Sequence, residues 1–250
     1  WSGIHKLNPS FIDTVYLEIL TGLFQLEDAG LITTLQPVGY LIPLAEIVIA
    51  LALLFPRFRN YAAFAACAMH LFILLYLSPL GIGANTVVYP WNLTLIAMVL
   101  LLFYRVPGEW AIIGQQMSPV LNATAIILVW VMPLFNFWGY WDNYLSFSLY
   151  SGKTNAFYIV VGEGELRKID ERLSAYFLQI EGLQGGQIIH VNKWALGELN
   201  VPFYPETRLL KQLSRSFCGL GIAQGQLYFL EFELPLEKQK FIRFNCDEMQ

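Results

Sequence analysis

Three ionisable side chains in the first half of the chain could do chemistry: Glu46 and His70, which lie inside apolar stretches, and Lys6, which lies near the end of an expected helix. Glu46 lies near the middle of the apolar stretch 37–55, and His70 lies in the run 60–104, whose 45 residues include no Asp, Glu, Lys or Arg. An ionisable group inside a membrane is costly and usually faces the interior of the helix bundle. Because an amine, a carboxylate and an imidazole all exchange protons, these three residues are the candidate catalytic residues.

The positions of Glu46 and His70 predict that their side chains meet. At a rise of about 1.5 Å per residue, Glu46 lies roughly 13 Å from Phe55 and His70 roughly 15 Å from Asn60. Two antiparallel helices that meet at the turn between them would hold both side chains at about the same depth. We expect a carboxylate–imidazole pair, which either serves proton transfer and ligand binding or only holds two helices together.

Four further side chains are candidate ligand-binding residues, namely Tyr40, Phe72, Trp91 and Asn92. Trp91 and Asn92 lie where the chain is expected to re-enter the membrane, at the end of a turn that is predicted over 80–91 outside the membrane and contains Gly, Pro and Asn. Aromatic rings and an amide can hold a flat ligand and fix its orientation. We expect this turn to cover a pocket between the helices.

Lys6 precedes Asn8-Pro9, where a helix would stop, and Ser2 and Gly3 suit close helix packing. Lys6 would then lie near the membrane surface. Its ammonium either extends into the lipid headgroups or serves as a functional amine at the mouth of the bundle.

The composition predicts a membrane domain followed by a soluble domain. The chain is 56% hydrophobic and 14% charged, whereas soluble domains carry about 25% charged residues. Of its 34 charged residues, 10 lie in residues 1–141 and 24 in residues 142–250. We expect an α-helical polytopic membrane bundle with about four spans over 1–141, followed by a small soluble α+β domain over 142–250. The chain begins at Trp1, so we also expect a preceding segment.

The expected spans cover 37–55, two segments within 60–104, and 117–137. The amphipathic segment 11–26 is too polar to span a membrane and is predicted as an interfacial helix. Arg57, Arg59 and Arg105 all fall at one end of these spans, which the positive-inside rule makes cytoplasmic. The protein is therefore expected in an inner or plasma membrane, with the 142–250 domain outside the cytoplasm.

The soluble domain is predicted to contain two helices and four strands. The helices are expected over Glu165–Ile180 and Pro205–Phe217, and the strands over Ala156–Val161, Gln187–Val191, Gln226–Leu234 and Lys240–Asn245, the last two as an antiparallel pair.

Several classes of function are disfavoured. The net charge of −4 argues against nucleic acid as a partner. No phosphate-binding glycine loop, nucleophile elbow or metal-ligand cluster is found in residues 142–250. The cysteines form no CxxC pair, and Cys218 and Cys246 could pair only if the fold brings them close. Haem at His70 is disfavoured because no second His is expected at its depth.

The string Trp1–Phe11 resembles the Ser/Ala-Gly-x-x-Lys-Leu segment of a membrane superfamily. This superfamily includes the vitamin K-dependent gamma-carboxylase, the bacterial horizontally transferred transmembrane proteins and the DoxX/MauE-like redox-associated proteins. The mid-span residues Glu46 and His70, and the segment Leu53–Arg57 where the first expected span ends, also agree with the pattern of this superfamily. The resemblance covers roughly residues 1–105. Further similarity to bacterial members with a soluble C-terminal extension lies in Pro90-Trp91-Asn92, Tyr150-Ser151-Gly152, Trp194, Glu198-Leu199 and Tyr204-Pro205.

The resemblance implies a quinone-like ligand and gives Lys6 the role of a base. The first hypothesis is thus a membrane protein that binds such a ligand for redox or proton-coupled chemistry, with Lys6, Glu46, His70 and Asn92 lining the cavity. The second is a non-enzymatic membrane anchor or assembly factor whose 142–250 domain binds a protein partner.

Overall fold

The computed structural model describes residues 1–83, 85–106, 118–178, 186–232 and 241–248. The chain divides into two compact units, unit 1 (Trp1–Lys153) and unit 2 (Thr154–Gln250), which are described separately. The sequence predicts the boundary at 141/142.

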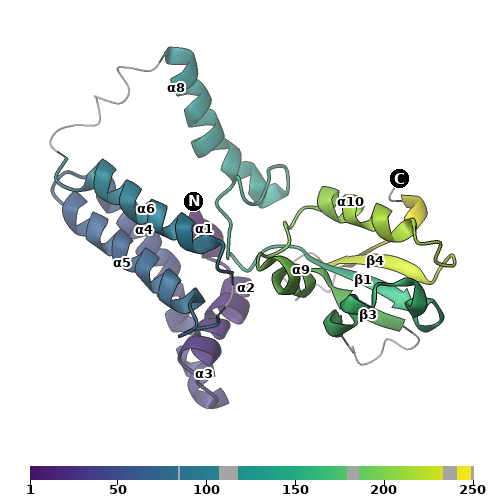
Figure 1. The fold of residues 1–250 in the computed structure, drawn as a ribbon. Helices are drawn as coiled ribbons and strands as arrows, with labels where there is room; N and C mark the ends of the chain where they lie inside the picture. The colour runs from purple at the N-terminus through teal and green to yellow at the C-terminus, as the bar shows by residue number, and fades with distance from the viewer. Residues whose placement is uncertain (84, 107–117, 179–185, 233–240, 249–250) are drawn as a thin grey trace. The chain divides into compact units, whose positions relative to one another are not determined.

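Unit 1 is helical throughout most of its described length (Figure 1). Its elements are α1 (Ser2–Lys6), α2 (Pro9–Phe11), the π-helical turns η1 (Ile12–Tyr16) and η2 (Ile19–Leu23), α3 (Ala29–Leu35), the 3-10 helix η3 (Gln36–Tyr40), α4 (Leu41–Leu54), α5 (Arg59–Leu77), α6 (Val88–Phe103), α8 (Pro119–Ile126), η4 (Ile127–Val131) and η5 (Met132–Trp138).

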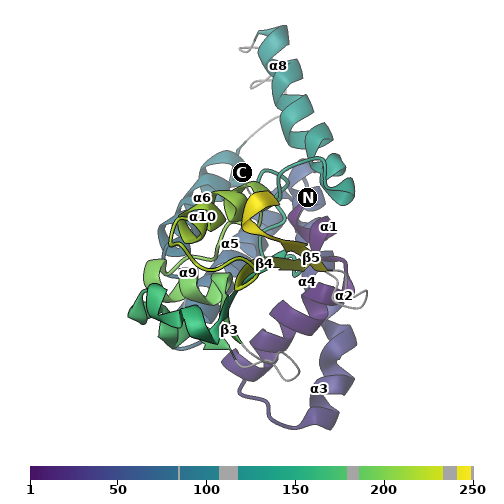
Figure 2. The ribbon, with the colours of Figure 1, turned by 90° about the vertical axis from the view of Figure 1, so that its right-hand side faces the viewer.

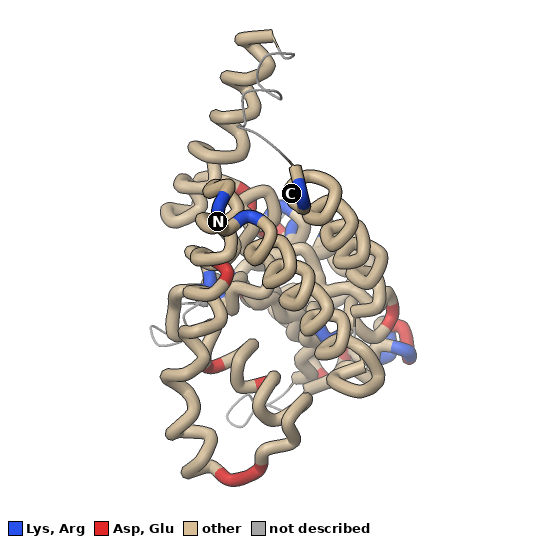
Figure 3. The backbone as a smooth tube through the Cα atoms, turned by 90° about the vertical axis from the view of Figure 1, so that its left-hand side faces the viewer, with Lys and Arg blue, Asp and Glu red and all other residues tan. Residues whose placement is uncertain are grey.

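Three helical segments are long and apolar enough to cross a membrane: Ala29–Leu54, Arg59–Leu77 and Pro119–Trp138. The apolar helix α6 is shorter. Charged residues are sparse along these helices (Figure 3). Many of their large apolar side chains, such as Val48 and Leu101, are exposed, as expected of helices that face lipid. The first candidate begins before the predicted Pro37, because α3 continues through η3 into α4. The predicted start of the last span at Met117 lies outside the described residues.

The segment predicted as an amphipathic helix over 11–26 is helical over α2, η1 and η2. Its buried face packs against α3, η3 and the start of α4. The buried residues are Phe11, Ile12, Tyr16 and Leu20, and their neighbours include Ile32, Leu35, Tyr40 and Ile42. Of the apolar residues that recur at helical spacing in this segment, Phe11, Ile12, Ile19 and Leu20 are buried, whereas Phe24 is 56% exposed.

Two glycines allow close backbone contacts in unit 1. A Cβ added at Gly3 would lie 2.6 Å from the Pro43 carbonyl oxygen, so α1 sits directly on the α4 backbone. Gly152 has a φ of +70°, and an added Cβ would lie 2.5 Å from the Ser10 carbonyl oxygen. Asn8 Nδ2 also donates to the Ser151 carbonyl oxygen at 2.9 Å, which holds this loop on α2.

Unit 2 contains a five-stranded antiparallel sheet in the order β2-β3-β1-β4-β5. The strands are β1 (Ala156–Gly162), β2 (Phe177–Leu178), β3 (Gly186–His190), β4 (Leu227–Phe232) and β5 (Phe241–Phe244). The central strand β1 places Ile159 opposite Ile189 on one side and Phe229 on the other.

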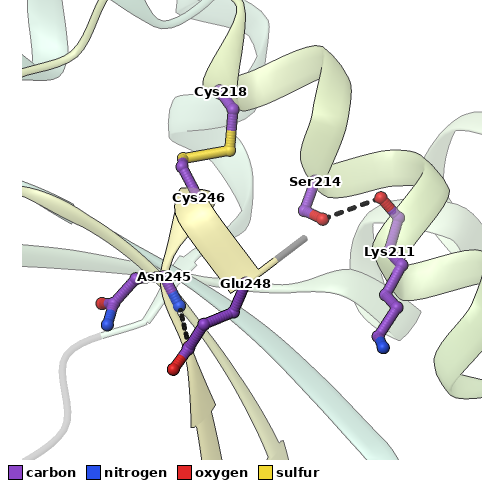
Figure 4. The surroundings of a disulfide bond; sticks show 6 residues. All are labelled: Lys211, Ser214, Cys218, Asn245, Cys246 and Glu248. Carbon is purple, nitrogen blue, oxygen red and sulfur yellow. Dashed lines mark hydrogen bonds between the residues drawn. A yellow bond between two sulfur atoms is a disulfide. The ribbon is translucent and has the colours of Figure 1, made fainter. Parts of the chain in front are cut away.

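The core of unit 2 lies between this sheet and the helices α9 (Val191–Leu199) and α10 (Thr207–Cys218) (Figures 1 and 2). Its fully buried members include Ile159, Ile189, Val191, Leu210 and Phe229. A disulfide joins Cys218, at the end of α10, to Cys246, at the start of the 3-10 turn η9 (Cys246–Glu248) (Figure 4). The fold thus brings together the two cysteines whose pairing the sequence leaves open.

The antiparallel pairing of β4 with β5 confirms the prediction for the described parts of 226–234 and 240–245. The predicted helix over 165–180 is wrong. Two 3-10 helices, η6 (Glu163–Lys168) and η7 (Glu171–Tyr176), lead into β2, and the extended backbone at Ile169 separates them. Residues 179 and 180 lie outside the described residues. The helix α9 was not predicted.

Candidate functional site

A buried ion pair joins α1 to α4. Lys6 Nζ lies 2.5 Å from Glu46 Oε1, and each side chain is only 10% exposed. The Gly3 contact with α4 explains the approach, because it brings the next turn of α1 against the same helix. Two of the three predicted catalytic residues therefore lie together.

The ion pair uses only part of the bonding capacity of each group. Glu46 Oε2 is buried and has no hydrogen-bond partner among the described residues. Within that same set, Lys6 donates to Glu46 alone, and an ammonium carries three N–H donors. The pair therefore offers one acceptor and further donors to a third group.

Aromatic contacts tie α1 to the last candidate span. The buried His5 ring stacks on Phe137, with centroids 4.7 Å apart and planes inclined by 21°. Trp1 Nε1 donates to the Val129 carbonyl oxygen at 2.8 Å. The ion pair thus belongs to a short helix with partners in α4, η4 and η5.

His70 pairs with Asn92 across α5 and α6. His70 Nδ1 lies 2.9 Å from Asn92 Oδ1, and Asn92 Nδ2 donates to the Val88 carbonyl oxygen at 2.9 Å. Because Oδ1 can only accept, His70 Nδ1 carries the proton in this arrangement. A neutral His70 ring then keeps Nε2 as an acceptor. The sequence placed both residues in one site, and the structure joins them directly.

The predicted Glu46–His70 pair is wrong. Glu46 bonds to Lys6, and His70 bonds to Asn92. Matching depth along two helices leaves open the direction in which each side chain points around its helix axis. The ammonium of α1 is also a stronger partner for a carboxylate than a neutral imidazole, since it brings a full charge.

The three predicted aromatic ligand-binding residues lie in different settings. Tyr40 packs against the buried cluster formed by Phe11, Ile12, Tyr16 and Leu20. Trp91 and Phe72 expose 61% and 37% of their surface. Asn92, which follows Trp91 on α6, is buried. The structure therefore places the amide inside the unit and the adjacent indole at its surface.

Unit 1 contains a second polar cluster that was not predicted from the sequence. Tyr76 on α5 donates its hydroxyl to Glu18 Oε2 at 2.8 Å, and Asn85 Nδ2 donates to the Tyr150 hydroxyl. Burial raises the pKa of Tyr150 to about 12, although the hydrogen bond from Asn85 opposes this shift. Asn85 has a φ of +57°, so its place in a turn was the available signal.

The described residues include no group of three or more His, Cys, Asp or Glu side chains that could hold a metal ion. Comparisons of the chain with protein-family models, with curated proteins and with solved structures find no match.

Proposed function

We propose that this chain is an integral membrane protein in which the Lys6–Glu46 pair binds the oxygen of a quinone-type ligand and exchanges a proton with it. The observation that carries the proposal is the buried 2.5 Å ion pair with one unused carboxylate oxygen. A buried polar atom without a partner costs roughly 1–3 kcal/mol, so a ligand hydroxyl that donates to Oε2 would remove this cost.

The chemistry follows from the two charges. Glu46 accepts the proton of a ligand hydroxyl through Oε2, and the O–H bond of the ligand breaks as the carboxyl O–H bond forms. The Lys6 ammonium then lies beside the oxygen anion that is left and stabilises it. In this arrangement Glu46 is the base, whereas the family resemblance would give that role to Lys6. The step moves one proton and no electrons.

His70 supplies the second hydrogen-bonding group in this proposal. With Nδ1 held by Asn92, Nε2 of the neutral ring can accept a hydrogen bond from a second ligand hydroxyl. Such a ligand, with two oxygens on a flat apolar ring, matches the hydroquinones. The resemblance to the DoxX/MauE-like and gamma-carboxylase superfamily is part of the same proposal.

We also place unit 2 outside the cytoplasm of an inner or plasma membrane. The Cys218–Cys246 disulfide supports this, because such bonds persist in oxidising compartments. The arginines at Arg57, Arg59 and Arg105 give independent support through the positive-inside rule. Labelling of intact cells with a membrane-impermeant maleimide after reduction tests it: a Cys67→Ser chain should be labelled at Cys218 and Cys246. Labelling only after lysis would overturn the placement.

The binding proposal is tested with the full chain in lipid nanodiscs and decylubiquinol as the probe, with quenching of tryptophan fluorescence as the readout. Lys6→Met and Glu46→Gln should each weaken binding by about tenfold or more, the loss expected for a hydrogen bond to a charged group. Glu18→Gln is the matched control, because this carboxylate belongs to the other polar cluster.

The pH dependence separates proton exchange from simple binding. Affinity for decylubiquinol should vary with pH in the wild-type chain and lose that dependence in Glu46→Gln. If both variants are folded and bind the probe as the wild type does, the proposal is wrong. The pair would then serve only to hold α1 on α4.

A further inference from the structure

Unit 2 carries a pocket of about 330 Å³ between η7, α9 and α10. Its wall is mostly apolar and includes Leu173, Val191, Trp194, Phe203 and Leu213. Leu173 and Val191 also belong to the buried core, so the pocket reaches the interior of the unit.

Packing behind the pocket holds its aromatic walls in place. The Trp194 ring meets Phe217 edge to face at 6.1 Å, and the Phe203 ring meets Phe157 in the same way at 5.6 Å. Asn192 Oδ1 accepts a hydrogen bond from the Phe203 backbone N–H at 2.8 Å. These contacts make a preformed site rather than one that a ligand must open.

The rim of the pocket carries three charges. Arg172 binds Asp170 through an N–O contact of 2.7 Å, and this guanidinium lowers the pKa of Asp170 to about 2. Glu198 accepts a hydrogen bond from the Tyr176 hydroxyl at 3.2 Å. Because Arg172 neutralises Asp170, the net charge of the rim is the single negative charge of Glu198, and this charge favours a positively charged partner.

The size and the mouth of the pocket indicate the kind of occupant. Its volume is at the lower end of the roughly 300–1,000 Å³ range of ligand pockets, which suits one large side chain better than an extended cofactor. Leu199 lies at the mouth and is 67% exposed. An anchor side chain in an apolar pocket, with charges at the rim, is the arrangement of a protein interface hot spot.

We propose that this pocket binds a segment of a partner protein that inserts one large apolar side chain and places a Lys or Arg next to it, against Glu198. This activity is separate from the proton exchange proposed for unit 1, and neither depends on the other. For the hypothesis of a membrane anchor or assembly factor, the pocket would be the site that recognises the protein partner.

The test uses the full chain in phosphatidylcholine nanodiscs and a fluorescent peptide of sequence Gly-Ser-Lys-Phe-Lys-Ser-Gly, with anisotropy as the readout. Two control peptides replace Phe with Ala or both Lys with Glu. The Lys-Phe-Lys peptide should bind about tenfold more tightly than either control, since each lacks one of the two recognition elements. Equal binding of the lysine and glutamate peptides would overturn the proposal, as would equal affinity for free phenethylamine.

Three variants locate the binding site. Ala195→Phe fills the pocket and should abolish binding, whereas Ala223→Phe, an exposed residue outside the pocket, should leave it unchanged. Leu199→Ser removes an apolar side chain from an exposed position at the mouth without adding charge, and it tests the site even where Ala195→Phe fails to fold. Wild-type affinity in folded Leu199→Ser would contradict the proposal.

The charge preference has its own variant. Glu198→Gln should reduce the advantage of the lysine peptide over the glutamate peptide, and Glu163→Gln, an exposed carboxylate outside the pocket, should not. If the Glu198→Gln chain prefers the lysine peptide over the glutamate peptide as strongly as the wild type does, Glu198 does not recognise the positive charge of the partner.

Discussion

Lys6 on α1 and Glu46 on α4 form a 2.5 Å ion pair that is nearly closed to solvent. Removing one partner leaves the other charge buried and uncompensated, which costs on the order of 3–5 kcal/mol. Replacing both by apolar residues of similar size costs much less, because no charge then remains to be solvated.

This asymmetry predicts the outcome of a double-mutant cycle. Lys6→Met alone should lower the thermal unfolding midpoint of the detergent-solubilised chain clearly, and Lys6→Met with Glu46→Leu should recover most of the loss. Additive losses in the double variant would show that the two charges are not coupled.

The contact of Gly3 with Pro43 predicts a steric effect. A methyl group at Gly3 would lie 2.6 Å from a backbone oxygen, which cannot rotate away as a side chain can. Gly3→Ala should therefore displace α1, lower the unfolding temperature and weaken binding of decylubiquinol. Ser2→Ala is the control on the same helix. A Gly3→Ala chain with wild-type stability and binding would argue against this packing.

The sequence could predict the apolar helices of unit 1 but not the partners of their polar residues. The run 60–104 has no charge, which predicts apolar helices there. Which partner Glu46 takes depends on how α1 packs against α4, and that contact is set by Gly3, far away in sequence. The mid-span positions of Glu46 and His70 therefore identified them as candidate site residues, but they did not determine which residue each side chain bonds to.

In unit 2 the sequence pattern wrongly predicted one helix over the segment that forms η6 and η7. Leu166, Ile169, Leu173 and Tyr176 recur at helical spacing, and all four pack on the core. These residues lie on or between two 3-10 helices rather than on one α-helix. The extended backbone at Ile169 ends the first, and Asp170 caps the second by accepting a hydrogen bond from the Arg172 N–H. The strand predicted over 226–234 is correct in its described part, where β4 pairs with β1 on one side and β5 on the other.

The disulfide of unit 2 predicts a local loss of stability on reduction. It links residues 28 apart and fastens the 3-10 turn after β5 to α10. Cys218→Ser should cost about 3 kcal/mol, and the amides of β4 and β5 should exchange faster in hydrogen-exchange mass spectrometry. Cys67→Ser removes a free cysteine of unit 1 and should leave this exchange unchanged.

His190 predicts that acid destabilises unit 2. Its Nδ1 accepts a hydrogen bond from the Asn192 backbone N–H at 3.2 Å and so caps α9, which a protonated ring cannot do. Burial lowers the pKa of His190 below its usual 6.5. The folded state thus holds fewer protons than the unfolded state between the two pKa values, and its stability falls as the pH drops below about 6.5 toward the folded pKa.

The measurement is hydrogen exchange of α9 and β3 at pH 7.5 and pH 5, corrected for the intrinsic effect of pH on exchange. Protection should be lower at pH 5 in the wild-type chain. His190→Asn provides the control, since an amide oxygen can accept the same capping bond and does not titrate. Protection in this variant should depend less on pH, and an equal dependence in both chains would assign the acid sensitivity to other groups.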